Sequence, residues 1–181
     1  GIEHDTNRQI LIGKKIDILI PSVNIGVEFD GIKWHTEFFG KKNRNYHLGK
    51  TVLCNEKGYG LIHIFEDEYV NKKYIVLHKL KHILGKDFDL PKIAGRKIEV
   101  KEIYSNDAKE FLDKFHIQGF YKSTVYIGGF YQDKLVAVMA LKNGNVTNNG
   151  WELTRFATDY HYIYQGAASK MFTYFVRKRS E

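Results

Sequence analysis

The segment from Lys14 to Asp30 constrains the fold of this chain more than any other part of the sequence. Apolar and polar residues alternate from Lys14 to Ile20, and a second alternating run, Ile25 to Asp30, follows the sequence Pro21-Ser22-Val23-Asn24. A period of two is typical of β-strands, and proline and asparagine favour tight turns. We therefore expect this segment to form an antiparallel β-hairpin.

The predicted turn also determines which residues face one another. If residues 21–24 form the turn, paired positions have numbers that sum to 45, so Asp17 lies opposite Glu28. Their Cβ atoms would be about 5 Å apart. The isoleucines at 16, 18 and 20 then point the other way, which places Asp17, Glu28 and Asp30 on the face away from the apolar layer.

Two carboxylates at facing positions repel each other unless a positive group lies beside them. A divalent cation such as Mg²⁺ meets this need, because hard oxygen ligands suit it and it can bind a phosphate at the same time. The alternative is an exposed sheet face on which the carboxylates are solvated or paired with Lys15 or Lys33.

The rest of the chain predicts two domains of mixed α/β (α+β) architecture. A basic helix at 43–57, a buried strand at 60–65 and an amphipathic helix at 70–84 complete a ββαβα order. The polar stretch 85–95, which contains Pro91, is the predicted linker. Beyond it we expect strands at 98–103, 124–131, 134–141 and 151–156, with helices at 107–115 and 165–177. The expected domains are 1–88 and 96–181, the first a mixed sheet flanked by helices.

Charge and composition narrow the classes of function. The net charge is +7, and basic clusters such as Lys41-Lys42-Asn43-Arg44 favour a polyanionic partner. No apolar run approaches the roughly 20 residues that span a bilayer, and the N-terminus lacks the pattern of a secretion signal, so we expect a cytoplasmic protein without a membrane partner. The single cysteine, Cys54, excludes an internal disulfide.

Part of the chain resembles a known nuclease family. The stretches Ile16–Pro21, Val27–Gly31 and Trp34-His35 are similar to the very-short-patch-repair branch of the PD-(D/E)xK nucleases, and more closely to phage homing endonucleases of the EDxHD type. Residues 46–50 and 61–69 match that group's basic helix and final core strand, so the resemblance covers residues 5–84. It implies a small restriction-endonuclease-like domain that cleaves double-stranded DNA with Mg²⁺ (or Mn²⁺). It also implies a phage-encoded enzyme in the cytoplasm of a bacterial host, and it leaves open a homodimer on DNA.

The resemblance assigns a role to individual residues. Asp17 matches the metal-binding aspartate and Glu28 the second acidic position, and both are the expected metal ligands. Asp30 stands where the wider superfamily has lysine, which leaves the general base open. His35 matches a histidine that activates water or assists at the scissile phosphate. The catalytic residues expected from the resemblance are Asp17, Glu28, Asp30, His35, His47 and Lys50.

Two of these residues lie on the predicted basic helix. Lys50 is expected to offset the charge that develops on the phosphate. His47 is expected to be a second base, a phosphate contact or a surface histidine. His63, inside an apolar strand, is expected to be a hydrogen-bonded structural histidine. The predicted DNA contacts are Lys33, Trp34, Lys41, Lys42, Arg44 and Arg155.

The second half resembles a different fold. Residues 111–119, 127–131, 152–156 and 166–172 are similar to the acetyltransferase-like fold of phage Mom-type DNA-modification proteins. In that fold the turn at 165–169 would present backbone N–H groups to the pyrophosphate of coenzyme A, although ordinary helix-start packing explains the same residues. The fold would need two further strands, so we expect this domain to be C-terminally incomplete and to contact DNA.

Three functions follow from these observations. The first is a metal-dependent DNA endonuclease. The alternatives are a catalytically weak DNA-binding module with a nuclease-like fold, and a DNA-modifying transferase that acts through the C-terminal domain.

Overall fold

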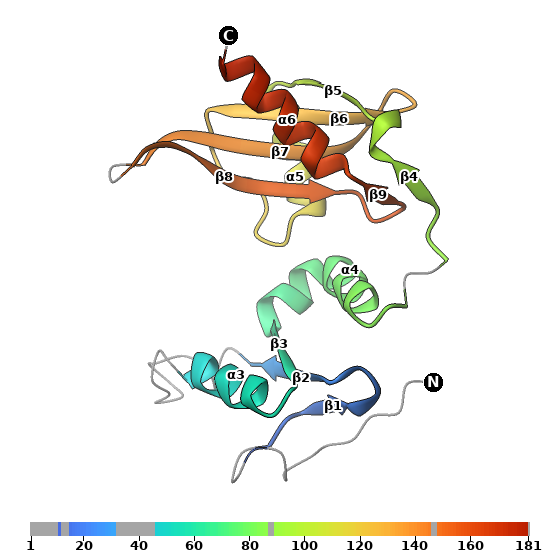
Figure 1. The fold of residues 1–181 in the computed structure, drawn as a ribbon, viewed down its shortest axis with the longest axis vertical. Helices are drawn as coiled ribbons and strands as arrows, with labels where there is room; N and C mark the ends of the chain where they lie inside the picture. The colour runs from blue at the N-terminus through green and yellow to red at the C-terminus, as the bar shows by residue number, and fades with distance from the viewer. Residues whose placement is uncertain (1–10, 12–14, 32–45, 87–88, 146–147, 181) are drawn as a thin grey trace. The chain divides into compact units, whose positions relative to one another are not determined.

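A computed structural model describes residues 11, 15–31, 46–86, 89–145 and 148–180 (Figure 1). These residues have the mixed α/β fold class that the sequence predicts. Their contacts divide the chain into two compact units, Gly1–Leu77 and His78–Glu181. The division falls inside helix α4 (Glu66–Ile83), upstream of the predicted linker at 85–95.

The first unit contains a three-stranded mixed sheet with the order β1-β2-β3. Its strands are β1 (Ile18–Ile20), β2 (Ile25–Asp30) and β3 (Gly60–Phe65). The pairs Ile18↔Val27 and Ile20↔Ile25 confirm the predicted hairpin register. A single 3₁₀ turn, η1 (Pro21–Val23), connects the strands, and Asn24 follows it with the left-handed φ of 54° that the turn requires.

Strand β3 runs parallel to β2, and helix α3 (Tyr46–Glu56) precedes it in the chain. The helix packs on β3, and its residue Cys54 joins a small apolar cluster with Leu19 and Leu61. Gly26 lies where these elements meet, and a Cβ atom there would lie 3.0 Å from the Leu61 side chain, which would have to shift. Helix α4 begins at Glu66, earlier than predicted, because three acidic residues in its first turn favour a helix N-terminus.

The second unit is built on an antiparallel sheet with the order β5-β6-β7-β8. Its strands are β5 (Glu99–Glu102), β6 (Val125–Tyr131), β7 (Lys134–Asn145) and β8 (Asn148–Thr158). Helix α5 (Ser105–Phe115) covers one face and α6 (Ala167–Ser180) the other (Figure 1). Alternate residues supply the two cores: Val138 packs on the α5 side, and Met139 packs with Met171 on the α6 side.

The predicted linker is partly a strand, which corrects the sequence interpretation. Strand β4 (Lys92–Ala94) pairs in parallel with β9 (Ile163–Gln165), and the 3₁₀ turn η2 (Gly95–Lys97) follows β4. Gly95 is required there, because a Cβ atom would lie 2.8 Å from the Gln165 carbonyl oxygen. Strands of three residues that pair across about seventy positions leave no periodic signal in a sequence.

Candidate functional site

Helix α3 turns a polar stripe toward the sheet of the first unit. Lys50 and Cys54 are buried on it, whereas Leu48 and Val52 are 62% and 45% exposed on other faces. The side chains that face the sheet follow the helical spacing i, i+3, i+4, i+7 and are His47, Lys50, Thr51 and Cys54. Burial of polar groups is costly unless each one finds a partner. The facing strands supply these partners.

The first partner is Glu28 in the middle of β2. Lys50 Nζ lies 2.5 Å from Glu28 Oε2, and both residues are only 4% exposed. The ammonium also donates to the Lys15 carbonyl oxygen at 2.5 Å. A fully buried and hydrogen-bonded ion pair of this kind ties α3 to the hairpin.

Asp17 lies beside this pair, where the predicted register places it. Its backbone N–H donates to Glu28 Oε1 at 3.1 Å, and its own Oδ2 accepts the Phe29 N–H at 3.0 Å. The two acidic residues therefore lie across the strand pair from each other, with Asp17 half-buried and Glu28 buried. The positive group that their proximity requires is the ammonium of Lys50, and a metal ion at Asp17 and Glu28 stays a prediction.

The acidic face of the hairpin is buried, which corrects the alternative of an exposed acidic face. Glu28 and Asp30 are 4% and 1% exposed. On the opposite face Ile20 and Val27 are also buried, whereas Ile18 and Phe29 are 42% and 45% exposed. The physical reason is that α3 brings cationic and hydrogen-bonding side chains onto the acidic face, so the carboxylates are matched there. Lys15 takes part through its carbonyl oxygen, and Lys33 lies outside the described residues.

A second cluster joins Asp30 to two histidines from different elements. His63 Nδ1 of β3 lies 2.7 Å from Asp30 Oδ2, and His47 Nδ1 of α3 lies 3.4 Å from the same oxygen. The two imidazole rings are perpendicular, with centroids 5.2 Å apart. Each residue offers one ligand atom, and these atoms lie within 4.8 Å of one another.

The hydroxyl of Thr51 indicates which ring nitrogen of His63 donates a hydrogen bond to it. Thr51 Oγ1 donates its only proton to the His47 carbonyl oxygen at 2.9 Å. It therefore accepts from His63 Nε2, 3.0 Å away, so this nitrogen carries a proton. The His63 nitrogen that faces Asp30 is Nδ1, and the 2.7 Å contact there needs a proton or another cation between the two atoms.

His63 is hydrogen-bonded, as the sequence predicts, but it also belongs to this cluster of ionisable side chains, which the sequence interpretation missed. The parallel register pairs His63 with Glu28, which is two residues before Asp30 on the same face of β2. The available signal was a polar residue in an otherwise apolar strand. Its partner could be identified only with the parallel pairing of β2 and β3.

Cys54 completes the buried stripe as an inert thiol. It is fully buried, and this burial raises its pKa above the ordinary value. Lys50 nearby lowers the pKa and Glu28 raises it, both to a smaller extent. The thiol is therefore held in its protonated form.

Six of the predicted site residues lie outside the described part of the chain and keep their predicted roles only as predictions. They are Lys33, Trp34, His35, Lys41, Lys42 and Arg44.

Arg155 has a structural role in the second unit. Its Nε donates to the Gly119 carbonyl oxygen at 3.1 Å, and its Nη1 donates to the Thr154 carbonyl oxygen at 2.7 Å. The guanidinium also lies over the Tyr121 ring, 5.2 Å from its centroid. These contacts hold the loop after α5 against β8. A DNA contact by Arg155 stays a prediction.

The predicted cofactor turn at 165–169 packs against η2. The helix that follows it begins at Ala167, and Lys170 Nζ donates to the Ile98 carbonyl oxygen at 2.6 Å. Gly95 approaches the Gln165 carbonyl oxygen from the other side. These contacts account for the turn as helix-start packing, and coenzyme A binding there stays a prediction.

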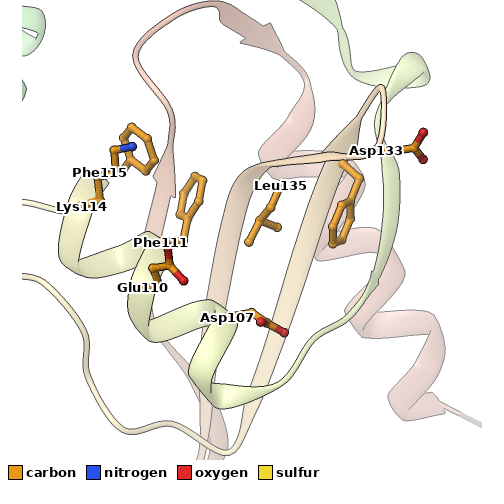
Figure 2. A pocket seen from close by; sticks show the side chains of 8 residues that line it. Asp107, Glu110, Phe111, Lys114, Phe115, Asp133 and Leu135 are labelled. Carbon is orange, nitrogen blue, oxygen red and sulfur yellow. The ribbon is translucent and has the colours of Figure 1, made fainter.

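A cavity of about 470 Å³ opens between α5 and the β6–β7 hairpin (Figure 2). Phe111 and Leu135 line its apolar part, and four exposed charged residues, three of them acidic, surround it. The complete lining is Asp107, Glu110, Phe111, Lys114, Phe115, Phe130, Asp133 and Leu135.

Comparison with known proteins does not indicate a function, so a functional proposal depends on the geometry of the site. No protein-family model matches the chain, and neither a curated protein nor a solved structure is detectably similar to it. Among the helices in the described ranges, none has the length and apolar character needed to cross a membrane.

Proposed function

We propose that the chain is a metal-dependent endonuclease that hydrolyses phosphodiester bonds in double-stranded DNA. The observation that carries this proposal is the convergence of Asp17, Glu28 and Lys50 across the hairpin and α3. Two carboxylates and an ammonium group together match the needs of phosphodiester hydrolysis, which are to hold a cation and to offset charge on the phosphate.

The position of Lys50 supports the proposal in a specific way. The wider nuclease superfamily has a lysine where this chain has Asp30, two residues after Glu28. Here an ammonium group reaches Glu28 from a different element, α3, at 2.5 Å. The lysine that is missing from the strand is thus supplied by the helix, with the charge in contact with the same carboxylate.

Asp17 and Glu28 would hold the Mg²⁺ or Mn²⁺ ion, since two carboxylates at facing strand positions are the oxygen donors that such cations prefer. Two hydrogen bonds are the feature that fits an ion: the Asp17 N–H donates to Glu28 and the Phe29 N–H donates to Asp17, so both carboxylates are held at neighbouring places. When bound, the ion supplies Lewis-acid activation of water and of the phosphate.

The side chains of the protein would perform the other tasks. Lys50 offsets negative charge beside Glu28, and His47, whose side chain is 25% exposed, is accessible for exchange of a proton with solvent or with a bound phosphate. His35 keeps its predicted role in activating water. The net charge of +7 supports DNA as the partner through release of counterions.

The biological setting forms part of the same proposal. We infer a phage-encoded enzyme that acts in the cytoplasm of a bacterial host, with a homodimer on DNA as an open question. The support comes from the resemblance of residues 5–84 to phage homing endonucleases.

A second candidate is a catalytically weak DNA-binding module with this nuclease-like arrangement. The observation that favours it is that Glu28 is matched by Lys50 without a metal ion. Calorimetric titration with Mg²⁺ and Mn²⁺ separates the two candidates, because an inactive module would bind neither ion at Asp17.

The decisive experiment is a plasmid-nicking assay with Mg²⁺ that compares the unaltered chain with Asp17→Asn. This substitution removes the charge, keeps an oxygen for the Phe29 N–H, and leaves the Glu28–Lys50 pair in place. The exposed Glu56→Gln on α3 is the matched control. We expect Asp17→Asn to lose cleavage while DNA binding in a gel-shift assay is retained. Full cleavage by Asp17→Asn would refute the proposed site.

A further inference from the structure

We propose that Asp30, His47 and His63 form a binding site for a divalent transition metal ion such as Zn²⁺ or Co²⁺. Neither Asp17 nor Glu28 belongs to this site, so it is separate from the ion expected for DNA cleavage. One carboxylate and two imidazoles, supplied by β2, α3 and β3, constitute the ligand set.

The geometry of the three ligands suits such an ion. Metal bonds of roughly 2.1 Å in a tetrahedral site separate neighbouring ligand atoms by about 3.4 Å. The distance from Asp30 Oδ2 to His47 Nδ1 is already 3.4 Å, and the distance to His63 Nδ1 is 2.7 Å. An ion bound between Asp30 and His63 would lengthen the second distance by less than 1 Å, and the ligand atoms of the two histidines, which lie within 4.8 Å of each other, would take a separation of about 3.4 Å.

The surroundings of His63 also match those of a metal ligand. Metal-binding histidines usually donate their second ring N–H to a neighbouring group, which fixes the tautomer and the orientation of the ring. Thr51 accepts the Nε2 proton of His63 at 3.0 Å and is itself fixed by its bond to the His47 carbonyl oxygen. With an ion bound, Nδ1 would then offer its lone pair to the metal beside Asp30.

The chemistry of the ligands selects the class of metal. Imidazole nitrogen suits Zn²⁺, Co²⁺ and related ions, whereas Mg²⁺ prefers oxygen ligands in an octahedral arrangement. Three protein ligands leave a coordination position for water or for a substrate oxygen, as in catalytic zinc sites. Access from solvent is through His47, whose side chain is 25% exposed, because Asp30 is 1% exposed.

The test uses the full chain after removal of metal with a chelator. Titration with Co²⁺, followed by visible absorption, and with Zn²⁺, followed by calorimetry, should each show one equivalent bound, and excess Mg²⁺ should not displace it. We expect His47→Gln and His63→Gln to weaken binding by at least about 100-fold, and Thr51→Val, which removes no ligand, by about 10–100-fold. His82→Gln, at an exposed position on α4, is the matched control and should bind normally.

Three outcomes would overturn the site. The first is the absence of stoichiometric binding by the folded chain. The second is unchanged affinity in both His47→Gln and Thr51→Val, which are checked for folding by circular dichroism. The third is loss of binding in Asp17→Asn, or a thiolate charge-transfer band from Cys54, which would place the ion elsewhere. A failed nicking assay leaves the proposed metal site standing, and failure to bind Co²⁺ leaves the proposed nuclease standing.

Discussion

Replacement of Lys50 by methionine tests the buried ion pair on which the first unit depends. The methionine keeps most of the volume of the side chain, so the main change is loss of the ammonium beside Glu28. With both residues 4% exposed, Glu28 would remain buried without its cation. Removal of one partner from a buried pair costs about 3–5 kcal/mol of unfolding free energy. With an m-value of roughly 1–3 kcal/mol/M, the urea midpoint should fall by about 1 M or more.

The assay can report on the first unit alone. Cys54 is the single cysteine of the chain and is fully buried, so the urea concentration at which its thiol reacts marks unfolding of this unit. The double variant Glu28→Gln/Lys50→Met removes both charges and should recover most of the lost stability, since a buried pair replaced as a whole is often neutral. An unchanged urea midpoint in Lys50→Met would refute the assignment of a buried pair. So would a double variant whose loss of unfolding free energy exceeds the sum of the losses in the two single variants.

Three further outcomes are expected. Cys54 should react slowly with thiol reagents in the native protein, because burial raises its pKa; rapid native-state labelling would contradict its placement. The pKa of His78 lies below its ordinary value of 6.5, through burial first and then the nearby Lys81 and His161. The unfolded chain therefore binds its proton more readily, and stability should fall as the pH drops through 6.5 toward the lowered pKa. The urea midpoint should depend less on pH in His78→Gln than in the unaltered chain, and the same pH dependence in both proteins would contradict this. Arg155→Lys keeps the charge but loses the geometry that reaches two carbonyl oxygens, so it should cost roughly 1–2 kcal/mol in urea unfolding; no loss would show those bonds to be dispensable.

The hairpin could be predicted in detail because its information is local. Pro21 and Asn24 determine the turn, the turn determines the register, and the register places Asp17 across from Glu28. The helix that carries His47 and Lys50 was also predictable from its spacing. These inferences involve neighbours in the chain or a single short turn.

The burial of the acidic face of the hairpin and the histidine cluster could not be predicted, because they depend on pairing between distant segments. β2 and β3 run parallel, and the helix between them decides which side of β2 is covered. Sequence alternation assigned the apolar residues to the core, where Ile20 and Val27 are indeed buried, but it did not show that α3 also covers Glu28 and Asp30. The same limitation explains why His63 was interpreted only as a structural residue and why β4 was interpreted as linker.

Cleavage of supercoiled plasmid by the full chain in Mg²⁺, measured beside Asp17→Asn at equal DNA occupancy, decides whether the acidic hairpin is an active site. We expect nicked or linear product from the unaltered chain and intact plasmid from the variant. Equal product from both proteins, or intact plasmid from both in Mg²⁺ and in Mn²⁺, would contradict the assignment of DNA hydrolysis to this site.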